Sequence, residues 1–107
     1  MLSLKDLQEQ HAEWLSHNFP DQQPHDGLLG LTEEVGELAH AHLKYYQGIR
    51  GIGQVQYLLE AGDAIGDIVI YLASYCNTNG FNLQEEVEKA WGQVSQRDWI
   101  NNPESGN

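Results

Sequence analysis

The chain has 107 residues, the size of one domain, and carries 5 Lys and Arg against 16 Asp and Glu for a formal net charge of −11. This balance argues against nucleic acid and anionic membranes as partners, because few side chains could neutralise a row of phosphates. The N-terminus has no signal-type apolar stretch and no apolar run approaches membrane length, so we expect a cytoplasmic protein.

Helical periodicity predicts four helices and no strand. The first covers about residues 4–16, behind a capping box formed by Ser3 and Asp6. After a loop with two prolines, the second covers about residues 27–47 and is followed by Gly48, a residue suited to the position after a helix end.

The third predicted helix covers about residues 54–77. The fourth begins at Asn82, a residue type that caps helix starts, and ends near Trp99. Four helices with short connections imply an all-α four-helix bundle. We therefore expect a single helical domain over residues 1–100 and a disordered tail over residues 101–107.

Three carboxylates mark the second predicted helix. At about 100° per residue, Glu37 projects between Glu33 and Glu34, so the three share one arc of the helix. Taken alone, the pattern is also typical of an amphipathic helix with a solvated charged face.

The third predicted helix is apolar on nearly every side between residues 64 and 76, where Asp67 is the only charge. Asp63 lies four residues earlier and hence on the same face. Buried carboxylates need cations or hydrogen-bonding partners, and basic residues are scarce in this chain. Magnesium prefers carboxylate oxygens and bridges to substrate phosphates, so these residues favour a Mg²⁺ site, with Mn²⁺ as a possible substitute.

Together the two helices resemble the MazG-like proteins of the all-α nucleoside triphosphate pyrophosphohydrolase superfamily. The resemblance is carried by residues 30–39 (GLTEEVGELA), 66–72 (GDIVIYL), 80–83 (GFNL), 47–51 (QGIRG) and 97–99 (RDW). It implies a magnesium-dependent enzyme that cleaves a nucleoside triphosphate between the α and β phosphates, giving monophosphate and pyrophosphate. We expect a homo-oligomer, a homodimer or homotetramer, because a chain this short buries only a modest core.

The resemblance also implies roles for individual residues. Glu34, Glu37 and Asp67 match the family's metal ligands. Glu33 matches a position that varies between branches, and we assign it a catalytic role as a ligand, a water-orienting residue or a base. The family has Glu three residues before Asp67, where this chain has Ala64. We assign the missing ligand's role to Asp63.

Some residues leave alternatives open. Glu60 is a weaker substitute for Asp63. The step Glu37-x-x-His40 is the unit of di-iron carboxylate proteins, which is one alternative function, and a catalytically silent acidic bundle that serves binding or assembly is another. Because basic residues are scarce, four of them are candidates for phosphate contact: Lys44, Arg50, Lys89 and Arg97. We expect the three tryptophans in the core or an interface: Trp14, Trp91 and Trp99.

Overall fold

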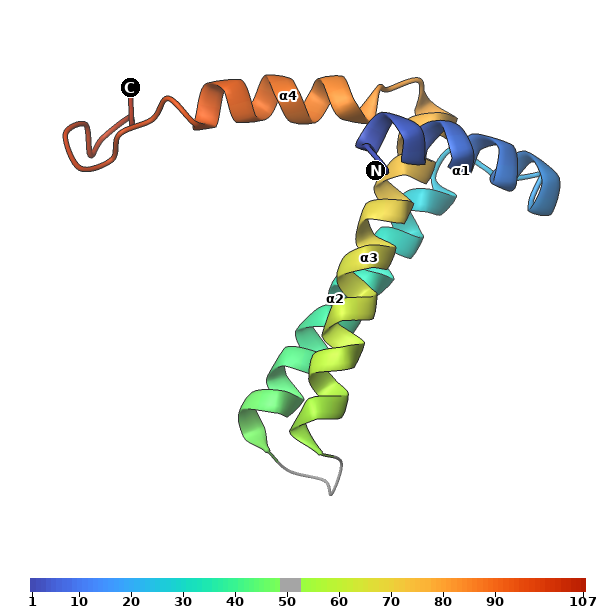
Figure 1. The fold of residues 1–107 in the computed structure, drawn as a ribbon, viewed down its shortest axis with the longest axis horizontal. Coiled ribbons are helices and arrows are strands. Elements are labelled where there is room, and N and C mark those ends of the chain that lie inside the picture. Colours follow the sequence, from blue (N-terminus) through green and yellow to red (C-terminus); the bar gives the residue numbers. More distant parts are fainter. Residues whose placement is uncertain (49–52) are drawn as a thin grey trace.

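The computed structural model describes residues 1–48 and 53–107, and within these ranges it contains helices and turns but no strand. The prediction of an all-helical chain is therefore confirmed. The helices are α1 (Leu4–Asn18), α2 (Asp26–Gln47), α3 (Gln54–Asn79) and α4 (Leu83–Val94) (Figure 1).

The helix ends follow signals that can be read locally. Ser3 Oγ accepts a hydrogen bond from the Asp6 N–H at 3.0 Å, and Asp6 Oδ2 accepts one from the Ser3 N–H at 3.2 Å, which completes the predicted capping box. Gly48 and Gly80 end α2 and α3 with left-handed φ values of 62° and 77°, which glycine adopts without strain. The Asn82 side chain caps α4, as predicted.

The C-terminal end of α4 differs from the prediction. The helix stops at Val94 and does not continue to Trp99. Beyond it, Asp98 Oδ1 accepts hydrogen bonds from two backbone N–H groups at 3.1 and 3.0 Å, and this side chain holds the backbone in a turn in place of a helical one. The Asp98 N–H donates to the Gly106 carbonyl at 2.7 Å, so residues 101–107, for which we predicted disorder, follow in turns.

Helices α2 and α3 form an antiparallel hairpin and lie side by side along their lengths (Figure 1). Small residues allow this close approach. Ala41 and Ala64 are buried, and a Cβ added to Gly27 would lie 2.9 Å from the backbone nitrogen of Tyr75. The distance between the two helices is therefore set by glycine and alanine at the contact.

Helix α1 crosses the end of the hairpin that carries the α3–α4 turn (Figure 1). The Gln8 side chain ties α1 to this turn: its Nε2 donates to the Phe81 carbonyl at 2.7 Å, and its Oε1 accepts from the Leu83 N–H at 2.8 Å. A small core lies at the junction of α1, α3 and α4, and it consists of Ala73, Cys76 and Leu83 with Leu4, Leu7 and Leu72 packed against it.

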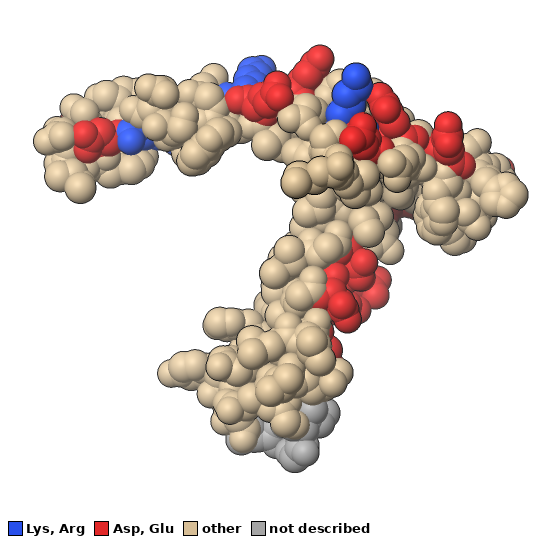
Figure 2. Space-filling model, viewed as in Figure 1, with Lys and Arg blue, Asp and Glu red and all other residues tan. Residues whose placement is uncertain are grey.

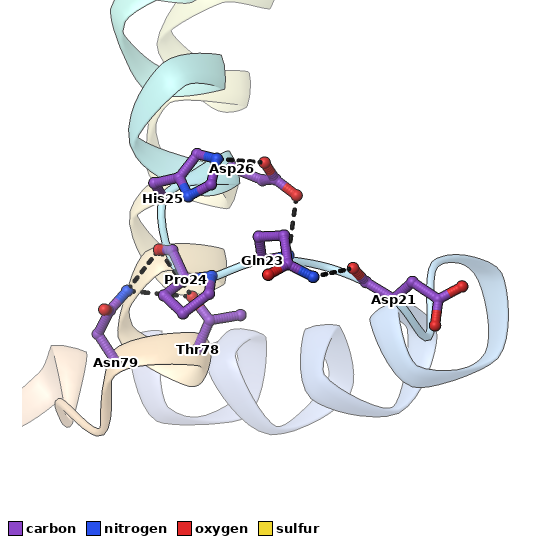
Figure 3. A network of polar contacts seen from close by, with 7 residues as sticks. All are labelled: Asp21, Gln23, Pro24, His25, Asp26, Thr78 and Asn79. Carbon is purple, nitrogen blue, oxygen red and sulfur yellow. Dashed lines mark hydrogen bonds and ion pairs between the residues drawn. The ribbon is translucent and has the colours of Figure 1, made fainter.

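The loop between α1 and α2 is fixed to the end of α3 (Figure 3). Asn79 Nδ2 donates to the Pro24 carbonyl at 2.8 Å, and Thr78 Oγ1 donates to the same carbonyl at 3.4 Å. The Gln23 N–H donates to Asp26 Oδ2 at 2.8 Å, at the start of α2. These bonds hold α1 in place over the hairpin.

The chain is far from spherical. Helix α4 projects sideways from the junction, and it contacts only α1 and α3 within the described part of the chain (Figure 1). The radius of gyration is 17.4 Å, whereas a compact chain of this length has about 13 Å. The fold thus consists of the hairpin of α2 and α3, the crossing helix α1 and the projecting helix α4.

Candidate carboxylate site

Acidic side chains gather on one side of the hairpin (Figure 2). On α2, Glu34 is half-buried and its Oε2 is a buried atom that lacks a hydrogen-bond partner within residues 1–48 and 53–107, while Glu33 and Glu37 are exposed. Desolvation, followed by the carboxyl groups of Glu37, Asp67 and Glu33, raises the pKa of Glu34. Neighbouring carboxylates thus disfavour the ionised form of Glu34, and a cation bound between them would reverse this effect.

The α3 carboxylates do not all lie on the same side of the site. Asp67 is half-buried and lines, together with Glu34, a cleft of about 780 Å³ between α1 and the hairpin, which we call the cleft. Glu60 lies instead along a smaller recess of about 420 Å³, the side groove, with Glu33 and Glu37. Asp63 is exposed and lines neither recess. Of the two candidates for the missing ligand, Glu60 is the one that shares a recess with other site carboxylates.

Ala64 is buried, whereas the carboxylates near it on α3 are exposed or half-buried. Its side chain is 2% exposed, because it faces the contact between α2 and α3. A longer acidic side chain at this position would have to leave the helix contact to reach solvent or a cation.

Apolar and aromatic side chains of α1 and the residue that follows it also line the cleft. Trp14, Leu15 and Phe19 line it, and the rings of Trp14 and Phe19 lie 5.7 Å apart between centroids. Trp14 was expected in the core or an interface; it is half exposed in the single chain and so lies outside the core, and the interface stays a prediction. The apolar stripe of α1 is visible in the sequence, whereas its position beside the carboxylates depends on how α1 crosses the hairpin.

His11 adds a polar group to this wall. Its side chain is 8% exposed, it lies 5.6 Å from Trp14 between ring centroids, and its Nδ1 has no hydrogen-bond partner in the described ranges. Burial lowers the pKa of His11, which favours the neutral ring. A neutral imidazole can both donate and accept hydrogen bonds. The sequence analysis missed His11, because a single histidine on a helix carries no spacing signal.

The predicted phosphate-binding residues lie elsewhere. Lys44 is buried in the hairpin, where its Nζ donates to Gln47 Oε1 at 3.2 Å. Lys89 lies on α4 and Arg97 follows it, while Arg50 lies outside the described residues. Among the described residues, no lysine or arginine lines the cleft or the side groove.

The donor set suits a hard cation. Among the described residues, no group of three or more His, Cys, Asp or Glu side chains is arranged to hold a metal ion as these side chains stand. However, the unpartnered oxygen of Glu34 lies among other carboxyl groups, and such oxygens are the ligands that Mg²⁺ prefers. The carboxylate side chains around Glu34 are therefore of the chemical type that binds magnesium.

Comparison of the chain with protein-family models, with curated proteins and with solved structures gives no significant match. The family resemblance therefore remains a prediction from the acidic motifs. Of the helices described, none is long and apolar enough to cross a membrane.

Proposed function

We propose that the chain is a magnesium-dependent nucleoside triphosphate pyrophosphohydrolase, which converts a ribo- or deoxyribonucleoside triphosphate and water to the monophosphate and pyrophosphate. The observation that supports this most directly is the cleft, which Glu34 and Asp67 line together with the aromatic side chains of Trp14 and Phe19. Glu34 and Asp67 come from separate acidic motifs, 33 positions apart in the printed sequence.

Magnesium would be held by Glu34, Glu37 and Asp67, with Glu60 or Asp63 as a further ligand. When bound, it supplies positive charge that neutralises the phosphates and lowers the pKa of a bound water. No lysine or arginine among the described residues lines the cleft, so the cation is the natural partner for an anionic substrate.

The wall of the cleft suits a nucleobase. The volume of the cleft, about 780 Å³, lies in the range of about 300–1,000 Å³ that is usual for small-molecule sites. Trp14 and Phe19 offer ring faces for stacking, and His11 lines the same cleft. The base would lie against α1 and the phosphates at the carboxylates.

Glu33 is the residue we assign to proton transfer. It is exposed, it lines the side groove beside Glu37, and its charge contributes to the raised pKa of Glu34. Hydrolysis breaks the bond between the α phosphorus and its bridging oxygen, water supplies the new oxygen, and Glu33 would accept the proton released.

The test is a screen of the eight common nucleoside triphosphates with Mg²⁺, followed by chromatography of the products. We expect monophosphate and pyrophosphate in equal amounts, and loss of at least about 100-fold in kcat for Glu34→Gln and Asp67→Asn. Glu88→Gln on α4 is the matched control and should keep full activity. Diphosphate with orthophosphate, or full activity in excess chelator, would contradict the proposal.

The same material separates the alternatives. A catalytically silent acidic bundle predicts no turnover of any nucleotide. A di-iron protein predicts bound iron, and His40 does line the side groove with Glu37, so elemental analysis of the purified protein decides between iron and magnesium.

A further inference from the structure

Asn79 is the only asparagine of the chain that a glycine follows. Because Gly80 has no side chain to shield its backbone nitrogen, this nitrogen can approach the amide carbon of the Asn79 side chain. Asn79 is also exposed, so water reaches it. The pair therefore has the composition at which an asparagine loses its amide group without an enzyme or a cofactor.

The reaction needs only water. The Gly80 nitrogen, after its proton is lost to a base in solution, attacks Cγ of Asn79. A bond forms between these two atoms, the bond from Cγ to Nδ2 breaks, and ammonia leaves with a proton taken from water. Water then opens the resulting succinimide at one carbonyl or the other, which gives aspartate or isoaspartate. Either product carries a new negative charge in place of the neutral amide.

Hydrogen bonds hold both reacting groups in the folded chain. The Gly80 N–H donates to the Cys76 carbonyl at the end of α3. Asn79 Nδ2 donates to the carbonyl oxygens of Pro24 at 2.8 Å and of Tyr75 at 2.9 Å. The attack therefore requires local opening of this turn, and its rate follows the population of the open state.

The bond to Pro24 joins parts of the chain that are distant in sequence (Figure 3). Pro24 lies in the loop between α1 and α2, and a second bond to its carbonyl, from Thr78 Oγ1, is longer at 3.4 Å. Gln22 in this loop and Asp26 at its end line the cleft. Asn79 thus fixes a loop that supplies part of the cleft.

Loss of the amide turns this contact from attraction to repulsion. A carboxylate has no hydrogen to donate, so the product places an anion beside the carbonyl oxygens of Pro24 and Tyr75. Isoaspartate also inserts the side-chain carbon into the backbone at the end of α3. Of the bonds to the Pro24 carbonyl in the described part of the chain, the longer one from Thr78 is the one that remains.

We propose that Asn79 is a site of spontaneous deamidation, and that its modification releases the loop between α1 and α2 from α3 and thereby alters the cleft. Water does not restore the amide, so the state of this side chain records the age of the molecule. Neither the modification nor the release of the loop depends on the proposed catalytic activity.

Peptide mapping by mass spectrometry measures the modification in protein kept at mildly alkaline pH. Asn79 should be the first asparagine to be modified, and more slowly in the folded chain than in urea. Thr78→Val removes a hydroxyl that bonds to the same carbonyl, so it should raise the rate in the folded chain by about 2- to 10-fold. Thr32→Val is the matched control, because its Oγ1 donates within α2 to the Leu28 carbonyl, and it should leave the rate unchanged. Earlier modification of another asparagine, or a rate that folding does not lower, would overturn the proposal.

Hydrogen exchange of the loop tests the consequence. Asn79→Asp produces the aspartate product directly, and it should raise the exchange rate of backbone N–H groups within residues 22–26 by at least about 10-fold. Asn82→Asp is the matched control, because it adds the same charge nearby and aspartate caps a helix as well as asparagine does. Unmodified protein that has aged until Asn79 is converted should show the same increase, so the test does not depend on the folding of a variant. Equal exchange in the two variants, or in fresh and aged protein, would show that the amide does not hold the loop.

Discussion

Replacing Gly27 by alanine should loosen the hairpin that carries the site. The added Cβ would lie 2.9 Å from the Tyr75 nitrogen and 3.2 Å from its Cα, whereas unstrained contacts between such atoms are about 3.5–4.0 Å. Both atoms belong to the backbone, so no side-chain rotation relieves the contact and the helices must move apart locally by about 0.5 Å. Overpacking of this kind costs about 1–3 kcal/mol.

The gain in helix propensity offsets only part of this cost. It is at most about 1 kcal/mol, and less at Gly27, which lies in the first turn of α2. The net loss should be about 1–2 kcal/mol. Gly36→Ala on the same helix is the matched control: nothing lies within 4 Å of its added Cβ, so it should gain about 1 kcal/mol.

Thermal unfolding followed by far-UV circular dichroism measures this difference. The two alanine variants should differ by about 2–3 kcal/mol, or roughly 9–13 °C in Tm for a domain of this size. All samples must have the same concentration, because association shifts Tm by mass action. If Gly27→Ala proves as stable as Gly36→Ala, the hairpin spacing is not set by glycine, and the reasoning from close approach is wrong.

Three further predictions concern the carboxylates. The pKa of Glu34 is raised, so its contribution to stability is present below the unfolded-state pKa and is lost as pH rises through the folded-state pKa. In urea titrations without Mg²⁺, Glu34→Gln should therefore unfold at a higher urea concentration than the unmodified chain at pH 7, and this difference should disappear toward pH 4. A difference that does not change with pH would contradict this. If Asp63 is the missing ligand, Asp63→Asn should lose pyrophosphate release as completely as Asp67→Asn while Glu60→Gln stays mild, and the reverse order would transfer the role to Glu60. Ala64→Glu should restore part of the activity of Asp63→Asn, but because Ala64 is 2% exposed, it should destabilise the metal-free chain by about 3 kcal/mol or more, which calorimetry with and without Mg²⁺ can measure.

The sequence predicted the features that depend on neighbouring residues. The capping box at Ser3, the glycine at the end of α2 and the cap at Asn82 each act within one helical turn, so their spacing in the chain is their spacing in space. Helical periodicity also groups Glu33 with Glu37, which line the side groove together, whereas Glu34 lines the cleft.

Features that depend on helix packing were not predictable. The cleft exists because α1 crosses the hairpin and brings Trp14 to the same recess as Glu34, and no local pattern encodes that crossing. Lys44 was a phosphate candidate by scarcity, yet it is buried beside Gln47, because its ammonium group finds an amide oxygen within its own helix. The end of α4 depends on Asp98, whose side chain competes with the helical backbone for N–H groups.

The side-chain amide of Gln8 fixes the direction in which α4 leaves the end of α3. It binds the Phe81 carbonyl with one atom and the Leu83 N–H with the other, on either side of the point where the chain changes direction. Helix α4 has 12 residues and is about 18 Å long, so a tilt of only about 10° at its base displaces its far end by roughly 3 Å. Gln8→Glu would keep the acceptor and lose the donor, releasing one of the two tethers. Gln8 lines neither recess on the hairpin, yet its two hydrogen bonds determine the position of Trp91 on α4.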